Sequence, residues 1–252
     1  MNIGFDGKVV IVTGAAHGFG RAIAESFAER GAAVHAFDVN KEGLAATLEL
    51  CGDRCVTHVL DIGDREAVLA EVGKIEKSAG RIDVLVNNAG GVRGQVGRPL
   101  EEISADDWQA IFDANLSGAF FLCQAVAPGM KRRRSGRIVN ISSGAGLGVS
   151  LTGIQAYASA KAGQIGLTRQ LAHELGPFNI TVNNVAPGFV RSNPTTERQW
   201  EAMGEDGQKR LLDNIALKRL GAPRDIAAMV MFFASDHAGW ISGQVISVDG
   251  GK

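Results

Sequence analysis

Residues 8–38 read KVVIVTGAAHGFGRAIAESFAERGAAVHAFD, and this stretch decides the fold. The apolar run Lys8–Thr13 predicts a buried strand, and the helical spacing of apolar residues in Arg21–Arg30 predicts a helix. Gly31 ends that helix, as glycine commonly does, and Ala33–Phe37 predicts a second strand. Two strands joined by a helix of this length indicate a βαβ unit, in which the strands are parallel.

The same alternation continues along the rest of the chain. Further strands are predicted at Val56–Leu60, Asp83–Val86, Arg137–Ser142, Ile180–Val185 and Val245–Val248, and further helices at Lys41–Leu50, Asp64–Ser78, Asp106–Met130, Ala156–Leu175 and Asp225–Ala234. This order predicts an α/β fold: a doubly wound parallel sheet of about seven strands between two helix layers, a three-layer sandwich. We expect residues 1–252 to form a single domain. The least regular stretch, Gly188–Gly221, predicts a substrate lid at about residues 190–220.

The charge balance and the apolar pattern exclude several classes of protein. The 252 residues carry 26 Lys and Arg against 27 Asp and Glu, so we expect no nucleic-acid partner held by phosphate neutralisation. No apolar run reaches the ~18 residues of a membrane span, and the N-terminus lacks the pattern of a secretory signal. We therefore expect a cytoplasmic protein with no membrane partner. Cys51 and Cys55 have no second pair of ligands nearby, so no metal site is predicted.

The turn after the first strand has the composition of a phosphate-binding loop. It reads TGAAHGFG (13–20), with glycines at Gly14, Gly18 and Gly20. Glycine permits a sharp turn and the close approach of a pyrophosphate, and the N-terminus of the next helix offers unpaired N–H groups. The loop therefore predicts a dinucleotide site.

Two carboxylates are candidates for the adenosine half of that dinucleotide. Asp38 closes the second strand, where it can accept hydrogen bonds from ribose hydroxyls and would repel a 2′-phosphate, which favours NAD over NADP. His17 is the only nearby cation that the sequence offers to a 2′-phosphate. Asp38 can also be read as a turn residue before Asn40, and Asp61 either contacts the adenine or caps the following helix.

The single tyrosine, Tyr157, precedes Lys161 by four residues near the start of a predicted helix. Side chains at this spacing lie on one face of a helix. A phenol with a pKa of about 10 is a poor base at neutral pH. One nearby ammonium group, helped by a positively charged nicotinamide, can lower that pKa by about 2–3 units. The pair therefore predicts a phenolate base, although a simple surface pair has the same spacing.

Polar residues gather at the carboxyl ends of the central strands, the edge where parallel sheets bind ligands. Asn140–Gly144 (NISSG) ends the fifth predicted strand, and Asn87–Gly90 (NNAG) ends the fourth. Asn115 interrupts an apolar helical stretch, where a buried amide needs a hydrogen-bonding partner.

These motifs, in this order, resemble the short-chain dehydrogenase/reductase family over almost the whole chain. The matching segments are TGxxxGxG (13–20), Asp61, NNAG (87–90), Asn115, Ser143, YxxxK (157–161), Pro187–Gly188 and the terminal VDGG (248–251). The resemblance implies a Rossmann-type fold and hydride transfer between an alcohol carbon and a nicotinamide cofactor. It also implies a homo-oligomer, commonly a tetramer, that acts on a small-molecule substrate.

The resemblance also implies a role for each matching residue. Tyr157 is the general acid and base, Lys161 lowers its pKa and binds the nicotinamide ribose, and Ser143 orients the substrate oxygen. Asn115 holds a water molecule of a proton relay. The implied cofactor-binding residues are Gly14, His17, Gly18, Phe19, Gly20, Asp38, Asp61, Ile62, Asn88, Ala89, Gly90, Tyr157, Lys161, Pro187, Gly188, Val190 and Ser192.

Two departures from the family pattern affect the site. Ser143 lies 14 residues before Tyr157 where 13 is commoner, so Ser142 is the second candidate for the catalytic serine. Ser192 stands where the family often has threonine. The loop after NNAG is long and polar, and Arg93, Gln95 and Gln155 are candidate substrate contacts; they can equally be solvated loop residues.

The sequence leaves three functions open. Asp38 and the polar loop favour an NAD-dependent oxidoreductase acting on a small polar secondary alcohol or ketone, such as a sugar or a polyol. An alternative is a carbonyl reductase for 3-oxoacyl thioesters, for which the basic run Lys131–Arg134 is a weak candidate docking surface. A third reading, from another class, is a nucleotide-binding scaffold or regulator that has lost catalysis.

Overall fold

The computed structural model describes residues 3–150 and 153–252. Its main elements are, in order, β1 (Val9–Thr13), α1 (Gly18–Ala28), β2 (Ala33–Asp38), α2 (Lys41–Cys51), β3 (Cys55–Val59), α3 (Arg65–Ala79), β4 (Val84–Asn87), α4 (Ala105–Phe112), α5 (Gly118–Arg133), β5 (Gly136–Ile141), α6 (Gln155–Leu175), β6 (Ile180–Pro187), α7 (Pro194–Ala202), α8 (Gly204–Asp213), α9 (Pro223–Ala234) and β7 (Val245–Val248). All the predicted strands are present, with ends within two residues of the prediction.

The strands form one sheet in the order β3-β2-β1-β4-β5-β6-β7, and every neighbouring pair is parallel. The order reverses direction between β1 and β4, which is the point where ligands bind in open α/β sheets. The predicted doubly wound Rossmann-type sheet is therefore confirmed.

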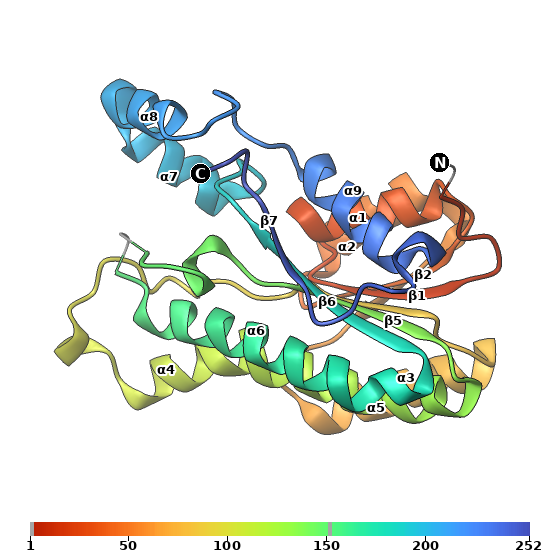
Figure 1. Cartoon of the computed structure of the whole chain (residues 1–252). Helices are drawn as coiled ribbons and strands as arrows, with labels where there is room; N and C mark the ends of the chain where they lie inside the picture. The colour runs from red at the N-terminus through yellow and green to blue at the C-terminus, as the bar shows by residue number, and fades with distance from the viewer. Residues whose placement is uncertain (1–2, 151–152) are drawn as a thin grey trace.

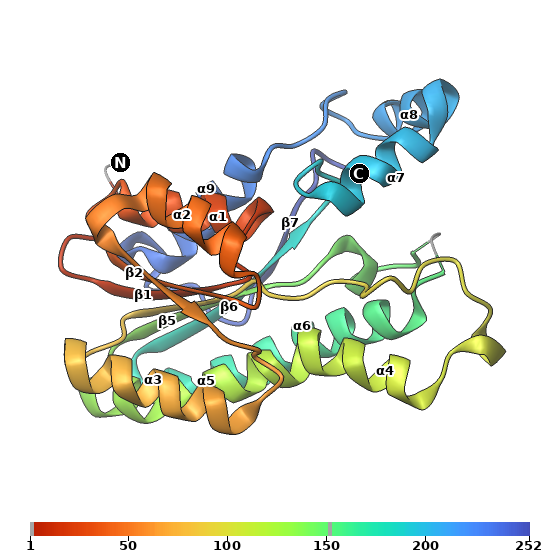
Figure 2. The same ribbon diagram turned by 180° about the vertical axis from the view of Figure 1, so that it is seen from behind.

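Helices cover both faces of the sheet (Figure 1). Helices α1, α2 and α9 lie on one face, and α3, α5 and α6 lie on the other, as the reverse view in Figure 2 also shows. Each interface has its own core: Phe27 and Phe233 belong to the first, and Leu122 and Ile138 to the second. Because both faces are covered, the central strands are buried along their whole length, which explains their continuous apolar sequence.

The helical stretch predicted at Asp106–Met130 spans Ala105–Arg133 and is capped by Ser104, whose Oγ accepts a hydrogen bond from the backbone N–H of Asp107 (3.1 Å). A π-helical segment, Asp113–Ser117, interrupts it. Within residues 3–150 and 153–252, this is the one helix long and apolar enough to cross a membrane by length and composition. It packs against the sheet, α3 and α6, as a core helix of an α/β domain does.

The expected lid segment contains regular structure that the sequence pattern did not predict. Helices α7 and α8 occupy much of it. Asn193 begins α7 with a capping box: its side chain accepts from the N–H groups of Thr195 (2.9 Å) and Thr196 (3.0 Å), and Thr196 Oγ1 accepts from the N–H of Asn193 (3.1 Å). An N-cap followed by proline is a helix-start signal that outweighs the polar composition of this stretch.

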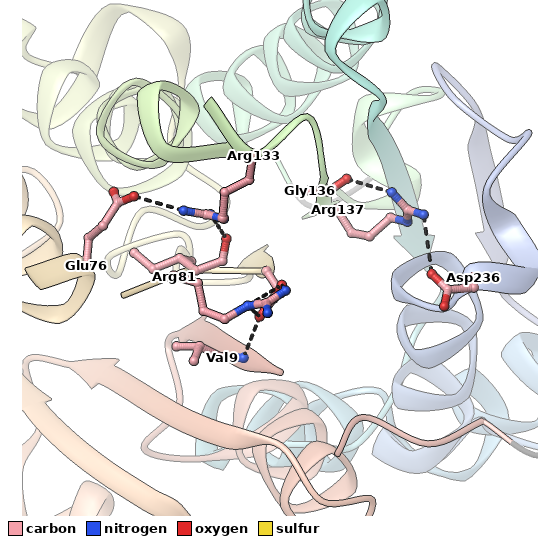
Figure 3. Close-up of polar contacts among 9 residues, drawn as sticks. Val9, Glu76, Arg81, Arg133, Gly136, Arg137 and Asp236 are labelled. Atoms are coloured by element: carbon pink, nitrogen blue, oxygen red, sulfur yellow. Dashed lines mark hydrogen bonds and ion pairs between the residues drawn. The ribbon is translucent and has the colours of Figure 1, made fainter. Parts of the chain in front are cut away.

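The amino edge of the sheet is held by paired charges (Figure 3). Asp83 Oδ2 accepts a hydrogen bond from the N–H of Val9 (2.9 Å) and one from Arg81 Nε (2.8 Å), which joins the starts of β1 and β4. Arg133 bonds Glu76 (3.0 Å) and so ties α5 to α3.

The basic run Lys131–Arg134 closes α5, as a helix end favours. Its charges are largely paired: Lys131 lies 3.3 Å from Glu174, and Arg132 and Arg133 lie 3.2 and 3.0 Å from Glu76. Three of its four cations thus contact one of two carboxylates, which weakens the run as a docking surface for an acidic partner.

Candidate active site

Lys161 is buried at the carboxyl edge of the sheet, with 3% of its surface exposed. Its Nζ donates a hydrogen bond to the carbonyl of Ile141 (2.8 Å), at the end of β5, and lies 5.7 Å from the ring centre of Tyr157. The predicted helical pairing of tyrosine and lysine is thus present. An ammonium group has three N–H donors, so this lysine keeps donors for a ligand after bonding Ile141.

Burial changes the acid–base properties of this pair in a way that the sequence did not anticipate. Burial lowers the pKa of Lys161 to about 7. Burial also raises the pKa of Tyr157 above its ordinary value, while a hydrogen bond with Ser143 acts in the opposite direction. In the protein alone, desolvation is thus the larger influence on Tyr157, and the lowering expected with Lys161 and an oxidised nicotinamide stays a prediction.

The structure distinguishes between the two candidate serines. The Ser142 hydroxyl is buried and donates to Asn184 Oδ1 on β6, so it faces into the sheet. Ser143 is the residue whose side chain bonds Tyr157, and its Oγ also accepts from the N–H of Ala145 (3.2 Å). The longer spacing to Tyr157 is accommodated in the intervening loop, and Ser143 is the serine that lies in the site.

Asn115 is fully buried in the π-helical segment, and its amide is satisfied. Its Nδ2 donates to the carbonyls of Gly91 (2.9 Å) and Ile111 (2.8 Å), and its Oδ1 accepts from the N–H of Gly91 (2.9 Å). A Cβ on Gly90 would lie 2.3 Å from this Oδ1 and 3.4 Å from Lys161 Nζ. Asn115 therefore fixes the loop after NNAG beside Lys161, and a water relay through it stays a prediction.

The glycine loop needs its glycines for internal packing. A Cβ on Gly20 would lie 2.1 Å from the carbonyl oxygen of Gly14. A Cβ on Gly14, which has φ +65°, would lie 2.8 Å from Cα of Ala89. A Cβ on Gly18 would lie 2.9 Å from the carbonyl oxygen of Ser192. The loop is thus pressed against the end of β4 and the base of the lid segment.

Asn88 and Thr13 bind this loop to β4. Asn88 Nδ2 donates to the carbonyls of Thr13 (2.9 Å) and Gly14 (3.2 Å), and Thr13 Oγ1 accepts from the N–H groups of Asn88 (3.0 Å) and Ala89 (2.9 Å). The role of Thr13 is missing from the predicted set. Its polar side chain at the end of an apolar strand was the available signal.

Helix α1 begins at Gly18 with no side-chain cap: His17 is exposed and forms no capping hydrogen bond. Backbone N–H groups at this helix start are therefore open to an anion. Phe19 packs its side chain on the core beneath α1, so only its backbone faces the loop.

Asp38 lies beside the glycine loop, as predicted. Its Oδ2 accepts from the N–H of Ala16 (3.0 Å) and its Oδ1 from the N–H of Asn40 (2.9 Å). The turn reading of this residue is thus present; each carboxylate oxygen retains a lone pair, and the bond to a ribose hydroxyl stays a prediction.

Arg21 is a second cation at this loop, which the sequence reasoning missed although it directly follows the last glycine. Its guanidinium donates to the Ala16 carbonyl, to Gly43 O (3.2 Å) and to Thr47 Oγ1 (3.1 Å), so its donors serve α2 and the loop.

Asp61 and Ile62 follow β3. Asp64, not Asp61, caps α3, since its side chain accepts from the N–H of Ala67 (3.1 Å). Asp61 is exposed, and among the described residues its carboxylate accepts only from the N–H of Gly63 (2.9 Å), which leaves the carboxylate free for a ligand. Ile62 is buried against Gly118 of α5, so its side chain serves packing.

The end of β6 joins the chain terminus. The N–H of Gly188 donates to the carbonyl of Val248 (3.0 Å), and a Cβ on Gly188 would lie 2.7 Å from Cβ of Asp249. Pro187 and Val190 are buried in this region. The PG and VDGG motifs are therefore one structural unit at the base of the lid segment.

The candidate substrate contacts are only partly supported by their positions. Gln95 is buried, and its Nε2 donates to the carbonyl of Asp107 (2.7 Å), which uses one of its two N–H groups; its contact with substrate stays a prediction. Gln155 Nε2 donates to the carbonyl of Arg98 (3.1 Å) and ties the loop to the start of α6. Arg93 is exposed, has φ +46°, and makes no side-chain hydrogen bond or ion pair with the described residues.

Comparison with known proteins decides the family. Residues 14–252 match the family model described as "Enoyl-(Acyl carrier protein) reductase". A 3-oxoacyl-(acyl-carrier-protein) reductase of Thermotoga maritima is 41% identical over 249 residues, covering 98% of each chain. The chain belongs to the short-chain dehydrogenase/reductase family. The hydroxy(phenyl)methylsuccinyl-CoA dehydrogenase subunit BbsD of Thauera aromatica is 42% identical to it over 253 residues, covering 99% of this chain and 98% of the relative.

Solved structures of the short-chain dehydrogenase/reductase family share the fold closely. Levodione reductase has a TM-score of 0.90 at 34% identity, covering 98% of each chain. A protein from Burkholderia xenovorans described as a short-chain dehydrogenase/reductase has a TM-score of 0.91 at 34% identity, covering 98% of this chain and 97% of the other.

Enzymes of this family use a nicotinamide cofactor, and the residues present fit one. The uncapped start of α1 suits the pyrophosphate, and Lys161 has N–H donors left for ribose hydroxyls. A bound nicotinamide supplies the carbon that gives or accepts hydride.

Proposed function

We propose that the protein is an NAD-dependent oxidoreductase that interconverts a hydroxyl and an oxo group on an acyl thioester. The observation that carries the proposal is the cluster of Ser143, Tyr157 and buried Lys161 at the carboxyl edge of the sheet. The substrate class rests on two relatives whose names describe acyl groups on carriers, an acyl-carrier protein and coenzyme A.

The residues of this cluster divide the proton chemistry. Tyr157 Oη takes the proton of the substrate hydroxyl during oxidation and returns one to the carbonyl oxygen during reduction. The Ser143 hydroxyl, bonded to Tyr157, holds the same substrate oxygen. Positive charge at Lys161 and on an oxidised nicotinamide offsets the burial that raises the pKa of Tyr157. Asn115 keeps the neighbouring loop in place, and we propose that it also holds a relay water.

The structure weakens the reason for expecting a sugar or polyol. That expectation rested on Asp38 and on polar contacts from the loop near Gln95 and Gln155, and each of these two amides donates one N–H to a backbone carbonyl. Exposed apolar side chains lie on the same two loops: Val96 (41% exposed), Leu147 (50%) and Val149 (91%). The loops touch where Gly97 N–H donates to the carbonyl of Gly153 (3.2 Å), and an apolar rim of this kind suits an acyl chain.

The preference for NAD rests on Asp38. Its carboxylate stands at the end of β2 beside the glycine loop, where it favours two ribose hydroxyls and opposes a 2′-phosphate. The Arg21 guanidinium does not offset it, because it donates to the carbonyls of Ala16 and Gly43.

Turnover of 3-hydroxyacyl-CoA substrates against a sugar and polyol panel, with NAD and with NADP, tests the proposal. We expect turnover of the thioesters and a preference for NAD. Asp38→Asn keeps an acceptor for the N–H of Ala16 but removes the charge, and should shift the NAD:NADP preference toward NADP by about 10–100-fold. Faster turnover of polyols than of thioesters would contradict the proposed substrate class. An unchanged NAD:NADP preference in Asp38→Asn would contradict the role proposed for Asp38.

Further features of the family are proposed for this chain. We propose a cytoplasmic homotetramer in which residues 190–220 act as a lid over the substrate. The proposed cofactor contacts are those named from the family motifs, with Phe19 and Ile62 contributing backbone atoms only. Light scattering checks the oligomeric state.

A further inference from the structure

Two of the three cysteines lie together at the far end of the molecule from the active site. Cys51 is the last residue of α2, and Cys55 is the first residue of β3, an edge strand of the sheet. The two side chains lie close enough for a hydrogen bond between them to influence the pKa of both, and both belong to the core cluster beneath α1 and α2. Two neighbouring thiols at the ends of adjacent elements can be joined by a disulfide when the turn between them brings their Cβ atoms within reach.

The pair lies directly beneath an exposed turn. Residues Gly52–Arg54 between the cysteines are all exposed, whereas Cys51 and Cys55 are 8% and 6% exposed. Gly52 has φ +59° and no atom within 4 Å of a Cβ built on it, so the turn has room to adjust. A small oxidant therefore needs only a local movement of this turn to reach the sulfurs.

The two thiols have different electrostatic environments. The hydrogen bond from Cys51 lowers the pKa of Cys55, whereas the pKa of Cys51 is raised by that bond, by burial and by the charges of Glu25 and Glu29. Cys55 is thus the better thiolate and the attacking sulfur, and Cys51 is the resolving thiol.

We propose that Cys51 and Cys55 form a redox modification site that hydrogen peroxide converts to an intramolecular disulfide. The Cys55 thiolate attacks one peroxide oxygen: an S–O bond forms, the O–O bond breaks, and hydroxide leaves as water after protonation. The Cys51 sulfur then attacks the Cys55 sulfenic acid: the S–S bond forms, the S–O bond breaks, and the thiol proton leaves in a second water. Two thiols are oxidised by two electrons, and one peroxide is reduced to two waters.

Cys123 provides a matched control inside the same chain. It is buried between α5 and the sheet, has no neighbouring thiol among the described residues, and accepts a hydrogen bond from Asn87 Nδ2 (3.4 Å). Burial raises the pKa of Cys123 to about 12. It should therefore stay reduced while the pair reacts.

The sequence makes the test direct, because trypsin cleaves after Arg54, between the two cysteines. The native full-length protein is treated with hydrogen peroxide, its free thiols are alkylated in denaturant, and it is digested without reduction. We expect peptides 42–54 and 55–65 to appear as one ion that separates on reduction, with Cys123 alkylated. Titratable thiols should fall from three to one. Separate alkylated peptides, or oxidation of Cys123 at an equal rate, would overturn the proposal.

Two variants identify the attacking sulfur. In Cys51→Ser, Cys55 should be trapped as a sulfenic acid by a 1,3-diketone probe, whereas Cys55→Ser should leave Cys51 largely unreacted. Equal reaction of Cys51 in the second variant would overturn the assignment. Circular dichroism confirms that each variant is folded. None of these measurements uses turnover, so their outcome is independent of the proposed oxidoreductase activity.

Discussion

The two edges of the central sheet differ in whether their charged side chains are paired. At the amino edge, Arg81 and Asp83 form a pair that also holds the N–H of Val9, and Arg133 is paired with Glu76 (Figure 3). At the carboxyl edge, Lys161 is buried with only a carbonyl as hydrogen-bonding partner among the described residues. Paired charges fasten elements together, whereas a buried and unpaired charge is costly and indicates a site that a ligand completes.

The same distinction applies to polar side chains around the site. Gln95 lies in the loop after β4 and Gln155 begins α6, and each donates one amide N–H to a backbone carbonyl. Lys161 keeps two N–H donors after its bond to Ile141. A polar residue near a site is therefore a candidate ligand only when its hydrogen-bonding groups are not already satisfied by the fold.

The largest effect should follow from replacing the reacting phenol. Tyr157→Phe removes the proton donor without changing the ring, so turnover should fall by about 10²–10⁴-fold while NADH affinity stays unchanged. Steady-state kinetics measures the turnover, and calorimetry measures the NADH affinity. Unchanged biological activity of the variant would instead favour the catalytically inactive regulator.

The next effect concerns the stability of the cofactor-free protein. Burial lowers the pKa of Lys161 from 10.5 to about 7, so the unfolded chain binds more protons between these values and stability rises with pH across that window. Lys161→Met removes a cost of a few kcal/mol, which is fully present below pH 7 and disappears toward pH 10.5. Thermal unfolding at pH 6 and pH 10 measures this.

The variant should therefore be more stable than the parent at pH 6 and should lose this advantage at pH 10, although it has lost activity. A variant less stable at pH 6 would mean that the hydrogen bond to Ile141 outweighs the cost of burial.

The smallest effect is expected at the opposite edge. Asp83→Asn keeps an acceptor for the N–H of Val9 but loses the charge that faces Arg81, so unfolding should become easier by about 1–3 kcal/mol. Turnover per folded molecule should not change, because the pair lies far from Tyr157. Urea unfolding measures the loss of stability, and kcat measures the turnover. A loss of kcat in fully folded protein would contradict the inference that the amino edge serves stability and the carboxyl edge serves catalysis.

Several features of the site could be predicted from the sequence because they depend on the spacing of residues close together in the chain. The spacing of Tyr157 and Lys161 places both on one helix face, and the turn at 13–20 needs glycine at each of its three positions. The parallel sheet followed from the alternation of strands and helices, whereas the order of its strands comes from the structure. Helix α7 was missed because its polar composition hid a start signal at Asn193 and Pro194.

Other features could not be predicted from the sequence because they depend on which side chains are buried. Nothing in the sequence indicates that Ser142 faces Asn184 while Ser143 faces Tyr157, or that Tyr157 is buried so deeply that desolvation raises its pKa. Both follow from which atoms lose water when distant segments pack together.

The sequence by itself determined the parallel sheet, the glycine loop after β1 and the placing of Tyr157 and Lys161 on one helix face, since periodicity and short-range spacing specify these directly. Only the tertiary structure decided which polar groups remain available. It bound one amide N–H of each of Gln95 and Gln155 to the backbone, left Lys161 without a charged partner, and brought Cys51 near Cys55. The physical reason is that hydrogen-bond satisfaction and solvation are properties of the packed chain, set by contacts between segments that no local pattern encodes.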